Sequence, residues 1–287
     1  MKLVTYLYRG SVSIGKVMDG EIIDFPASDP TLPRTMLAFL EMGPQAMDRA
    51  RQLNVGNAVT VPFSAATLLA PISNPSKFLA IGMNYQKHVE EAREGGLTIP
   101  NVQVWFNKQV SCINGPYNAI HMPTVSDMLD YEVELGVVIG RRCRNVSVED
   151  ARSVIAGYMV CNDVTVRDWQ LRSPTMTIGK SFDTTGPTGP WIVTDDEIED
   201  PHALTMQLFV NGEQRQHEST AGMVYNIYQQ IAHLSTAMTL EPGDILATGT
   251  PSGVGMAMKP PQFLKVGDVV RAQIDAIGMI ENTVIAV

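Results

Sequence analysis

Two glutamates separated by one residue, Glu132 and Glu134, are the strongest chemical signal in this 287-residue chain. The surrounding residues 129–140 are β-branched and apolar and are bounded by glycines, which predicts a strand. Side chains alternate between the faces of a strand, so both carboxylates share one face with Gly136 and Val138, and a sheet buries the other face. Two adjacent like charges repel, and a hard divalent cation that takes oxygen ligands from both relieves the repulsion. The alternative is a pair of acids on a solvated strand face.

A second candidate pair, His88 and Glu91, lies three residues apart in the polar segment 84–96. On one helical turn these two side chains face the same way. A histidine that is hydrogen-bonded to a carboxylate can act as a general base toward water. The alternatives are a surface histidine and, for the carboxylate, Glu90 in place of Glu91.

Three motifs that suggest other chemistry fail on their spacing. Gly179-Lys180-Ser181 resembles the end of a phosphate-binding loop, but Pro174 stands where that loop needs a glycine. The serine in residues 249–253 is not centred between the glycines, which excludes a nucleophile elbow. The sequence also lacks a dinucleotide-binding glycine fingerprint and a His-x-x-x-His zinc motif.

Composition restricts the partners and the compartment. The net charge of −9 argues against a nucleic-acid partner, and no apolar stretch is long enough to span a membrane. The first residues alternate like a strand and lack the pattern of a signal peptide. Three widely spaced cysteines suit a reducing compartment. We therefore expect a cytoplasmic protein with neither a nucleic-acid nor a membrane partner.

The pattern of elements predicts an α+β protein that is mostly β. Residues 1–72 form a small α+β N-terminal domain, with a hairpin over 12–25 that turns at Asp19-Gly20 and short helices over 35–53 interrupted at Gly43-Pro44. Residues 73–287 form a larger, β-rich domain. Its predicted strands are 78–83, 104–107, 158–160, 191–194 and 206–210, and its predicted helices are 147–157 and 220–238.

Five segments, taken together and in order, resemble the fumarylacetoacetate hydrolase superfamily. They are residues 82–91, 106–108, 129–140, 162–183 and 249–255. The resemblance covers roughly residues 75–287, and the preceding part is similar to the shorter leading domain of the bacterial two-domain members. It implies a mixed β-roll or sandwich with flanking helices, and a homodimer or, in some members, a tetramer.

The resemblance also implies a metal site. In that family the Glu-x-Glu strand and a later aspartate hold Mg²⁺ or Mn²⁺, and the matching positions are Glu132, Glu134 and Asp163. Three carboxylates without sulfur or imidazole suit a hard cation. The alternative for Asp163 is a turn aspartate that caps its own backbone.

Further roles follow from the same resemblance. His88 and Glu91 match a catalytic pair on a lid, and Lys180 matches a lysine that stabilises the developing oxyanion or enolate. The alternative for Lys180 is an ion pair with Asp183 or Asp168. Substrate-binding roles are implied for four residues, each of which could instead serve only the structure, through a turn or an ion pair: Thr250, Arg167, Gln170 and Lys108. Tyr158 and Gln216 are weaker candidates.

The family acts on small 2-oxo acids, with a metal ion that supplies Lewis-acid chemistry. Our leading hypothesis is a hydrolase that cleaves a C–C bond in an acylpyruvate or fumarylpyruvate type of 2,4-dioxo acid, giving pyruvate and a carboxylic acid. Oxaloacetate decarboxylation, isomerisation of a hydroxymuconate or hydroxyheptadienedioate, and sugar-acid dehydration are the alternatives on this fold. A non-catalytic metal-binding protein is a further alternative. Substrate choice is predicted to depend on a lid over residues 92–103 and on Trp105, Gln109, Tyr117, Trp169 and Met176.

Overall fold

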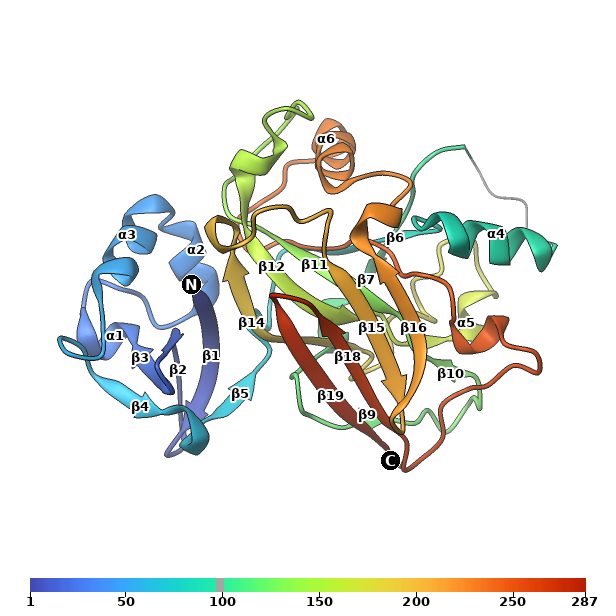
Figure 1. Ribbon diagram of the computed structural model, residues 1–287, viewed down its shortest axis with the longest axis horizontal. Coiled ribbons are helices and arrows are strands. Elements are labelled where there is room, and N and C mark those ends of the chain that lie inside the picture. The colour runs from blue at the N-terminus through green and yellow to red at the C-terminus, as the bar shows by residue number, and fades with distance from the viewer. Residues whose placement is uncertain (97–100) are drawn as a thin grey trace.

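The computed structural model describes residues 1–96 and 101–287. The α+β, mostly β fold class is confirmed, because two β-sheets form the body of the molecule and the helices are short and peripheral (Figure 1). Residues 97–100 of the predicted lid lie outside the described part. No helix within the described residues is long and apolar enough to cross a membrane.

The first part of the chain folds as its local sequence predicts. The hairpin turns at Asp19 and Gly20, whose φ angles of 51° and 79° suit this tight turn. Gly43, with φ 68°, precedes a helix that starts at Pro44, so the predicted interruption is confirmed. The elements of this part are β1 Lys2–Tyr8, β2 Ser11–Met18, β3 Glu21–Asp24, α1 Phe25–Ser28, α2 Met36–Glu41, α3 Pro44–Gln52, β4 Thr60–Pro62 and β5 Thr67–Leu69.

The larger sheet has 12 strands and runs through both parts of the chain. Strand β1 pairs with β14, and Lys2 lies opposite Val193. The division into domains at residues 72 and 73 stays a prediction, because the backbone pairing continues across it. The order is β4-β3-β2-β1-β14-β12-β11-β17-β6-β7, with β14 Gly186–Thr194, β12 Ile155–Asn162, β11 Val133–Ile139, β17 Ile245–Ala247, β6 Phe78–Gly82 and β7 Val104–Lys108; β5 also pairs with β1, and β8 Ile113–Asn114 pairs with β14.

A second sheet of five strands packs against the first and completes the roll (Figure 1). Leu135 and Tyr158 from the large sheet share one buried cluster with Met206 and Ala272 from the small sheet. This burial of two apolar faces explains why the sheets stack. The order is β16 Glu213–Ser219, β15 Thr205–Val210, β18 Val269–Ile274, β19 Gly278–Ile285 and β9 Ile120–His121; β10 Leu129–Asp130 pairs separately with β13 Thr165–Val166.

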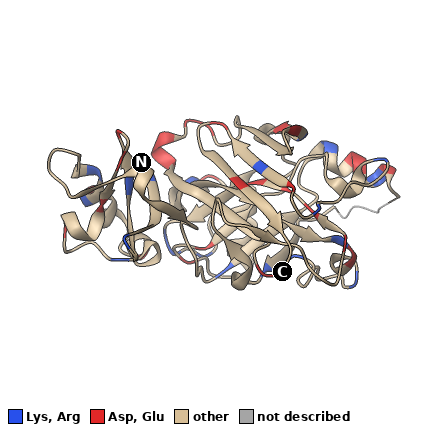
Figure 2. Cartoon of the chain, turned by 90° about the horizontal axis from the view of Figure 1, so that it is seen from below, with Lys and Arg blue, Asp and Glu red and all other residues tan. Residues whose placement is uncertain are grey.

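Three helices lie at the edges of the roll. Helix α4 (Gln86–Glu94) and the single turn α5 (Arg167–Gln170) lie at the right of Figure 1, and α6 (Ile227–Ala237) lies at its top. Lysine and arginine are interspersed with aspartate and glutamate over both parts of the chain, and α4, beside the grey trace, carries both signs (Figure 2).

The helix predicted over residues 147–157 is wrong. Ser147 does accept a hydrogen bond from the amide of Asp150, but only a single 3₁₀ turn follows, η3 (Ala151–Val154). Strand β12 then starts at Ile155 and passes through Gly157, where a Cβ atom would lie 2.1 Å from a neighbouring carbonyl oxygen. Burial of the apolar run between two neighbouring strands outweighs the local capping signal.

The two other long predictions need smaller corrections. The predicted strand 129–140 is split into β10 and β11, with Tyr131 and Glu132 between them, and both faces of β11 are buried. The predicted helix 220–238 is confirmed only for Ile227–Ala237, where Asn226 and Gln229 form a capping box. A 3₁₀ turn, η5 (Thr220–Gly222), precedes it.

Candidate active site and metal centre

Three buried carboxylates converge where β11 begins and β12 ends. Ligand atoms of Glu132, Glu134 and Asp163 lie within 4.8 Å of one another. Antiparallel pairing of β11 with β12 brings them together, because Val133 lies opposite Asn162. The amide of Asp163 donates to the carbonyl of Glu132 at 2.9 Å, which fixes the two backbones beside each other.

Three cations from other segments surround this triad. The Nζ atom of Lys180 lies 2.7 Å from a carboxylate oxygen of Glu132 and 2.7 Å from one of Asp163. The Nζ atom of Lys108 lies 2.7 Å from the second oxygen of Asp163. Arg167 contacts the second oxygen of Glu132 through Nη1 at 2.7 Å. Each of these pairs is buried, where an unpaired charge would be costly.

The charges within the triad are unequally compensated. Burial would raise the pKa of Glu132, but Lys180 and Arg167 outweigh it and hold that pKa at about 2. Burial, followed by repulsion from Asp163 and Glu132, raises the pKa of Glu134 well above its ordinary value. Within the described chain Glu134 makes no ion pair, and it accepts a hydrogen bond from the amide of Gly249 at 2.7 Å. A divalent cation fits this oxygen-only site and supplies the missing positive charge.

The predicted catalytic pair forms one contact on α4. His88 Nδ1 lies 2.9 Å from one carboxylate oxygen of Glu91, and the other oxygen accepts from the amide of Gly253 at 3.2 Å. His88 is 8% exposed. The chain enters α4 through Asn84, whose buried amide donates to the carbonyl of Thr248 at 2.7 Å. Because Glu91 occupies Nδ1 of His88, Nε2 is the ring nitrogen that can exchange a proton with a substrate.

Lys180 and Arg167 form ion pairs with acids that are distant in sequence. Among the described residues, Lys180 pairs with the triad and not with Asp183 or Asp168. Arg167 pairs with Asp130 at 2.8 Å and with Glu132. The Nη2 atom of Arg167 is buried and has no hydrogen-bond partner within residues 1–96 and 101–287, so one donor remains available to a ligand.

The remaining predicted substrate-binding residues lie around the same centre. Thr250 is 4% exposed and lies in the glycine loop next to Gly249. Gln170 accepts from Arg167 at 3.1 Å. Lys108 is 1% exposed and is held by Asp163 and the carbonyl of Val164, so its position favours charge balance over direct substrate contact. Substrate contact by Thr250, Gln170 and Arg167 stays a prediction.

Sequence reasoning missed the role of Asp130. This fully buried carboxylate accepts from the amides of Gly255 and Met256 at 2.8 and 2.9 Å, and it also holds Arg167. It therefore joins the end of the glycine loop to the cation that contacts Glu132. Its position two residues before Glu132 was the available signal.

Two further residues support the site; they lie in the segments 106–108 and 162–183, but the sequence assigned them no role of their own. Asn162 accepts from the amide of Glu132 at 3.0 Å and so helps to place that ligand. The ring of Phe106 has its centroid 4.9 Å from the ammonium of Lys180, a cation–π contact. Both lie beside residues that the sequence did single out, but their contacts depend on the folded arrangement.

Two of the residues that were predicted to select the substrate, Trp169 and Met176, lie next to Gln170, and a third, Tyr117, is exposed. Trp169 packs edge-on against Phe182 at 5.3 Å, and Met176 accepts a weak contact from Gln170 at 3.7 Å. Tyr117 is 48% exposed and bonds to the C-terminal hairpin. A role in substrate choice stays a prediction for this set.

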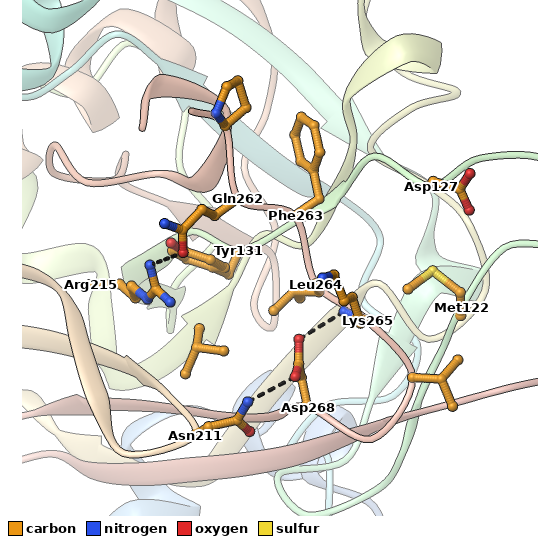
Figure 3. A pocket seen from close by; sticks show the side chains of 13 residues that line it. Met122, Asp127, Tyr131, Asn211, Arg215, Gln262, Phe263, Leu264, Lys265 and Asp268 are labelled. Carbon is orange, nitrogen blue, oxygen red and sulfur yellow. Dashed lines mark hydrogen bonds between the residues drawn. The ribbon is translucent and has the colours of Figure 1, made fainter. Parts of the chain in front are cut away.

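A large cavity of about 640 Å³ lies outside the carboxylate centre (Figure 3). Its wall includes Arg215, which donates to Gln262 at 2.6 Å, and Asp268, which accepts from Asn211 at 2.8 Å. Both hydrogen bonds are formed within the wall itself, and none of the predicted site residues lines the cavity. The size of this cavity therefore does not identify the reaction site.

Comparison with known proteins agrees with this geometry. The family model of the fumarylacetoacetate (FAA) hydrolase C-terminal domain matches residues 77–285. The chain belongs to the fumarylacetoacetate hydrolase family. It is 41% identical to the oxaloacetate tautomerase Fahd2a, mitochondrial, of Rattus norvegicus over 99% of this chain and 92% of that protein.

Two solved structures share the whole fold. The fumarylacetoacetate hydrolase of Exiguobacterium antarcticum is 35% identical, with a TM-score of 0.88 and coverage of 100% of both chains. The maleylpyruvate hydrolase of Sphingobium, in complex with manganese and pyruvate, is 31% identical, with a TM-score of 0.82 and coverage of 100% of this chain and 99% of that chain.

Proposed function

We propose that this protein is a divalent-metal-dependent enzyme that interconverts the keto and enol forms of oxaloacetate. The observation that carries the proposal is a histidine–carboxylate pair beside a buried triad of carboxylates. His88 is near enough to Glu132 to favour its charged form. The similarity to an oxaloacetate tautomerase along almost the entire chain supports the choice of substrate.

Keto–enol exchange requires one proton to leave C3 and one to reach the oxygen on C2. His88 Nε2 is suited to carry the C3 proton, because Glu91 holds Nδ1 and thereby orients the ring. The Lys180 ammonium is suited to stabilise the negative oxygen of the enolate. A magnesium or manganese ion held by Glu132, Glu134 and Asp163 would supply Lewis-acid chemistry to the 2-oxo acid.

Binding of the substrate carboxylates is assigned to the donors that the protein leaves available. Arg167 Nη2 is buried without a partner in the described chain, and Thr250 lies in the loop that caps Glu134. A carboxylate is the ligand that best satisfies such donors. The proposed substrate is accordingly a small, doubly charged 2-oxo acid.

Hydrolysis of a C–C bond in an acylpyruvate is the second candidate. The same pair, His88 and Glu91, could deprotonate a water molecule in place of C3. The similar maleylpyruvate hydrolase, whose structure contains manganese and pyruvate, supports this candidate. Decarboxylation, dienoate isomerisation and sugar-acid dehydration use the same enolate chemistry and remain alternatives.

The test uses metal-stripped protein with Mg²⁺ or Mn²⁺ added back. The loss of enol absorbance reports the ketonisation of enol-oxaloacetate. In separate assays, the release of pyruvate is measured with oxaloacetate, acetylpyruvate or fumarylpyruvate as the substrate. Metal-dependent loss of enol without pyruvate supports the tautomerase. Pyruvate plus a carboxylic acid from a dioxo acid supports the hydrolase, and pyruvate from oxaloacetate alone supports a decarboxylase. Metal-dependent stabilisation with every substrate inert would leave a non-catalytic metal-binding protein.

The same preparation tests the predicted assembly. Light scattering with and without metal reports whether the chain forms the homodimer or tetramer expected from the family resemblance. The cytoplasmic location stays a prediction.

A further inference from the structure

We propose that Gln216 is a positioning residue that fixes the hydroxyl of Thr250 as a hydrogen-bond donor to the substrate carboxylate. This inference rests on the proposed function, because it concerns how the same site holds a 2-oxo acid. Gln216 lies on β16 and is 1% exposed. It is not one of the three carboxylates, the three cations around them or the catalytic pair.

The hydrogen bonds of Gln216 determine which way its amide points. Its Oε1 accepts from the amide of Val133 at 3.0 Å, and its Nε2 donates to the carbonyl of Pro251 at 2.9 Å. A backbone amide can only donate and a backbone carbonyl can only accept. The orientation is therefore unambiguous, and Nε2 must also be the donor in its 2.9 Å contact with Thr250 Oγ1.

This contact decides what the Thr250 hydroxyl can do. Because Thr250 Oγ1 accepts from Gln216, its own proton must point to a different acceptor. Nowhere in the described residues does the hydroxyl of Thr250 donate to a protein group. The proton is thus available to a ligand oxygen, and a carboxylate, which only accepts, matches it.

Gln216 also ties Thr250 to the metal-binding strand. The Val133 amide that it binds lies between Glu132 and Glu134, and Gly249, next to Thr250, donates to Glu134 at 2.7 Å. One buried side chain therefore sets the position of a substrate-binding hydroxyl relative to two proposed metal ligands. Loss of Gln216 should weaken substrate binding without removing any metal ligand.

The experiment measures the affinity for oxalate, a small dianion that resembles an enolised 2-oxo acid, by calorimetry in the presence of Mg²⁺. In Gln216→Glu the hydroxyl of Thr250 can donate to the new carboxylate, so it no longer donates a hydrogen bond to the ligand. In Gln216→Met the hydroxyl keeps its proton but loses its orientation. We expect oxalate to bind about tenfold more weakly to Gln216→Met, as for one lost hydrogen bond, and more weakly still to Gln216→Glu.

A double-mutant cycle separates this role from a general structural one. Thr250→Val removes the hydroxyl, and if Gln216 acts through it, Gln216→Met should cost less than about twofold in the Thr250→Val background. Full tenfold additivity would overturn the proposal. Affinity for Mn²⁺, measured on the same variants without oxalate, should change by less than about threefold if the metal ligands are undisturbed.

A matched control removes a buried amide elsewhere. Asn282 on β19 is fully buried and donates to the carbonyl of Asn118 at 2.7 Å. Asn282→Asp should lower the melting temperature but leave oxalate affinity within about twofold, because no contact links it to Thr250. An equal loss of oxalate affinity in this control, or no oxalate binding by the unmodified protein, would overturn the inference. If the double-mutant cycle shows the expected coupling of Gln216 and Thr250 but the protein is inactive toward oxaloacetate, only the proposed function is rejected.

Discussion

Replacing Glu134 by glutamine should raise the stability of the metal-free protein while removing its stabilisation by metal. Glu134 is 1% exposed, has a raised pKa through burial and the neighbouring Asp163 and Glu132, and is bonded to the amide of Gly249. Glutamine keeps an acceptor for that amide and removes a buried carboxylate that makes no ion pair within the described chain. The metal-free variant should therefore melt at a higher temperature than the metal-free unmodified protein.

With metal bound, the order is reversed, and Glu134→Gln should melt at a lower temperature than the unmodified protein. At a metal concentration about 100 times the dissociation constant, binding stabilises a folded protein by about 2.7 kcal/mol. In a protein of 287 residues, that corresponds to a rise in melting temperature of about 4–5 °C. Glu134→Gln removes one of three charged ligands, so most of this rise should disappear at the same concentration of Mg²⁺. Metal-dependent turnover should disappear with it.

Glu132→Gln is the matched contrast. Glu132 is paired with both Lys180 and Arg167, and its replacement leaves two buried cations short of a partner. Breaking such a buried pair costs about 3–5 kcal/mol, so this variant should melt well below the unmodified protein even without metal. Scanning calorimetry of both variants with and without Mg²⁺ provides the test. Equal destabilisation of the two metal-free variants, or an undiminished response of Glu134→Gln to Mg²⁺, would refute the reasoning.

Three further predictions concern His88, a histidine outside the site, and the glycine that precedes Lys180. His88→Gln should lower kcat at least about 100-fold, as expected for loss of a general base, while calorimetry shows the metal response unchanged. His202 accepts the amide of Ile227 at 3.1 Å, and burial lowers the pKa of His202 below its ordinary value of about 6.5. The folded state favours the neutral ring of His202, so this ring contributes to stability above pH about 6.5, and the contribution is lost as the pH falls below that value toward the folded pKa. The urea concentration at the unfolding midpoint should therefore be lower at pH 5.5 than at pH 7.5, and the difference should be smaller in His202→Gln. Gly179→Ala should reduce stability and kcat together, because the new Cβ would lie 2.1 Å from the backbone nitrogen of Gln170 and displace the segment that carries Lys180; unchanged melting and kinetics would contradict this.

Local sequence patterns determined the features that depend on neighbouring residues. The turn at Asp19-Gly20 and the helix start after Gly43 follow from backbone preferences, and strand periodicity predicted β11. The ordered set of motifs was also sufficient to indicate the family, which the match over residues 77–285 confirms. The three carboxylates were singled out in the same way, and the structure brings them together.

The tertiary structure alone decided the charge pairing and the supports of the site. Lys180 and Arg167 could each have paired with an acid close in sequence, but folding brings them to Glu132, which is distant from both. The residues near 150 carry a helix signal, yet the chain continues as the strand β12, because β12 is buried between β11 and β14. Gln216 makes its contacts with Val133 and Thr250 only when β16 meets β11 and the glycine loop. Such contacts depend on which segments share a buried space, and a local pattern contains no information about that.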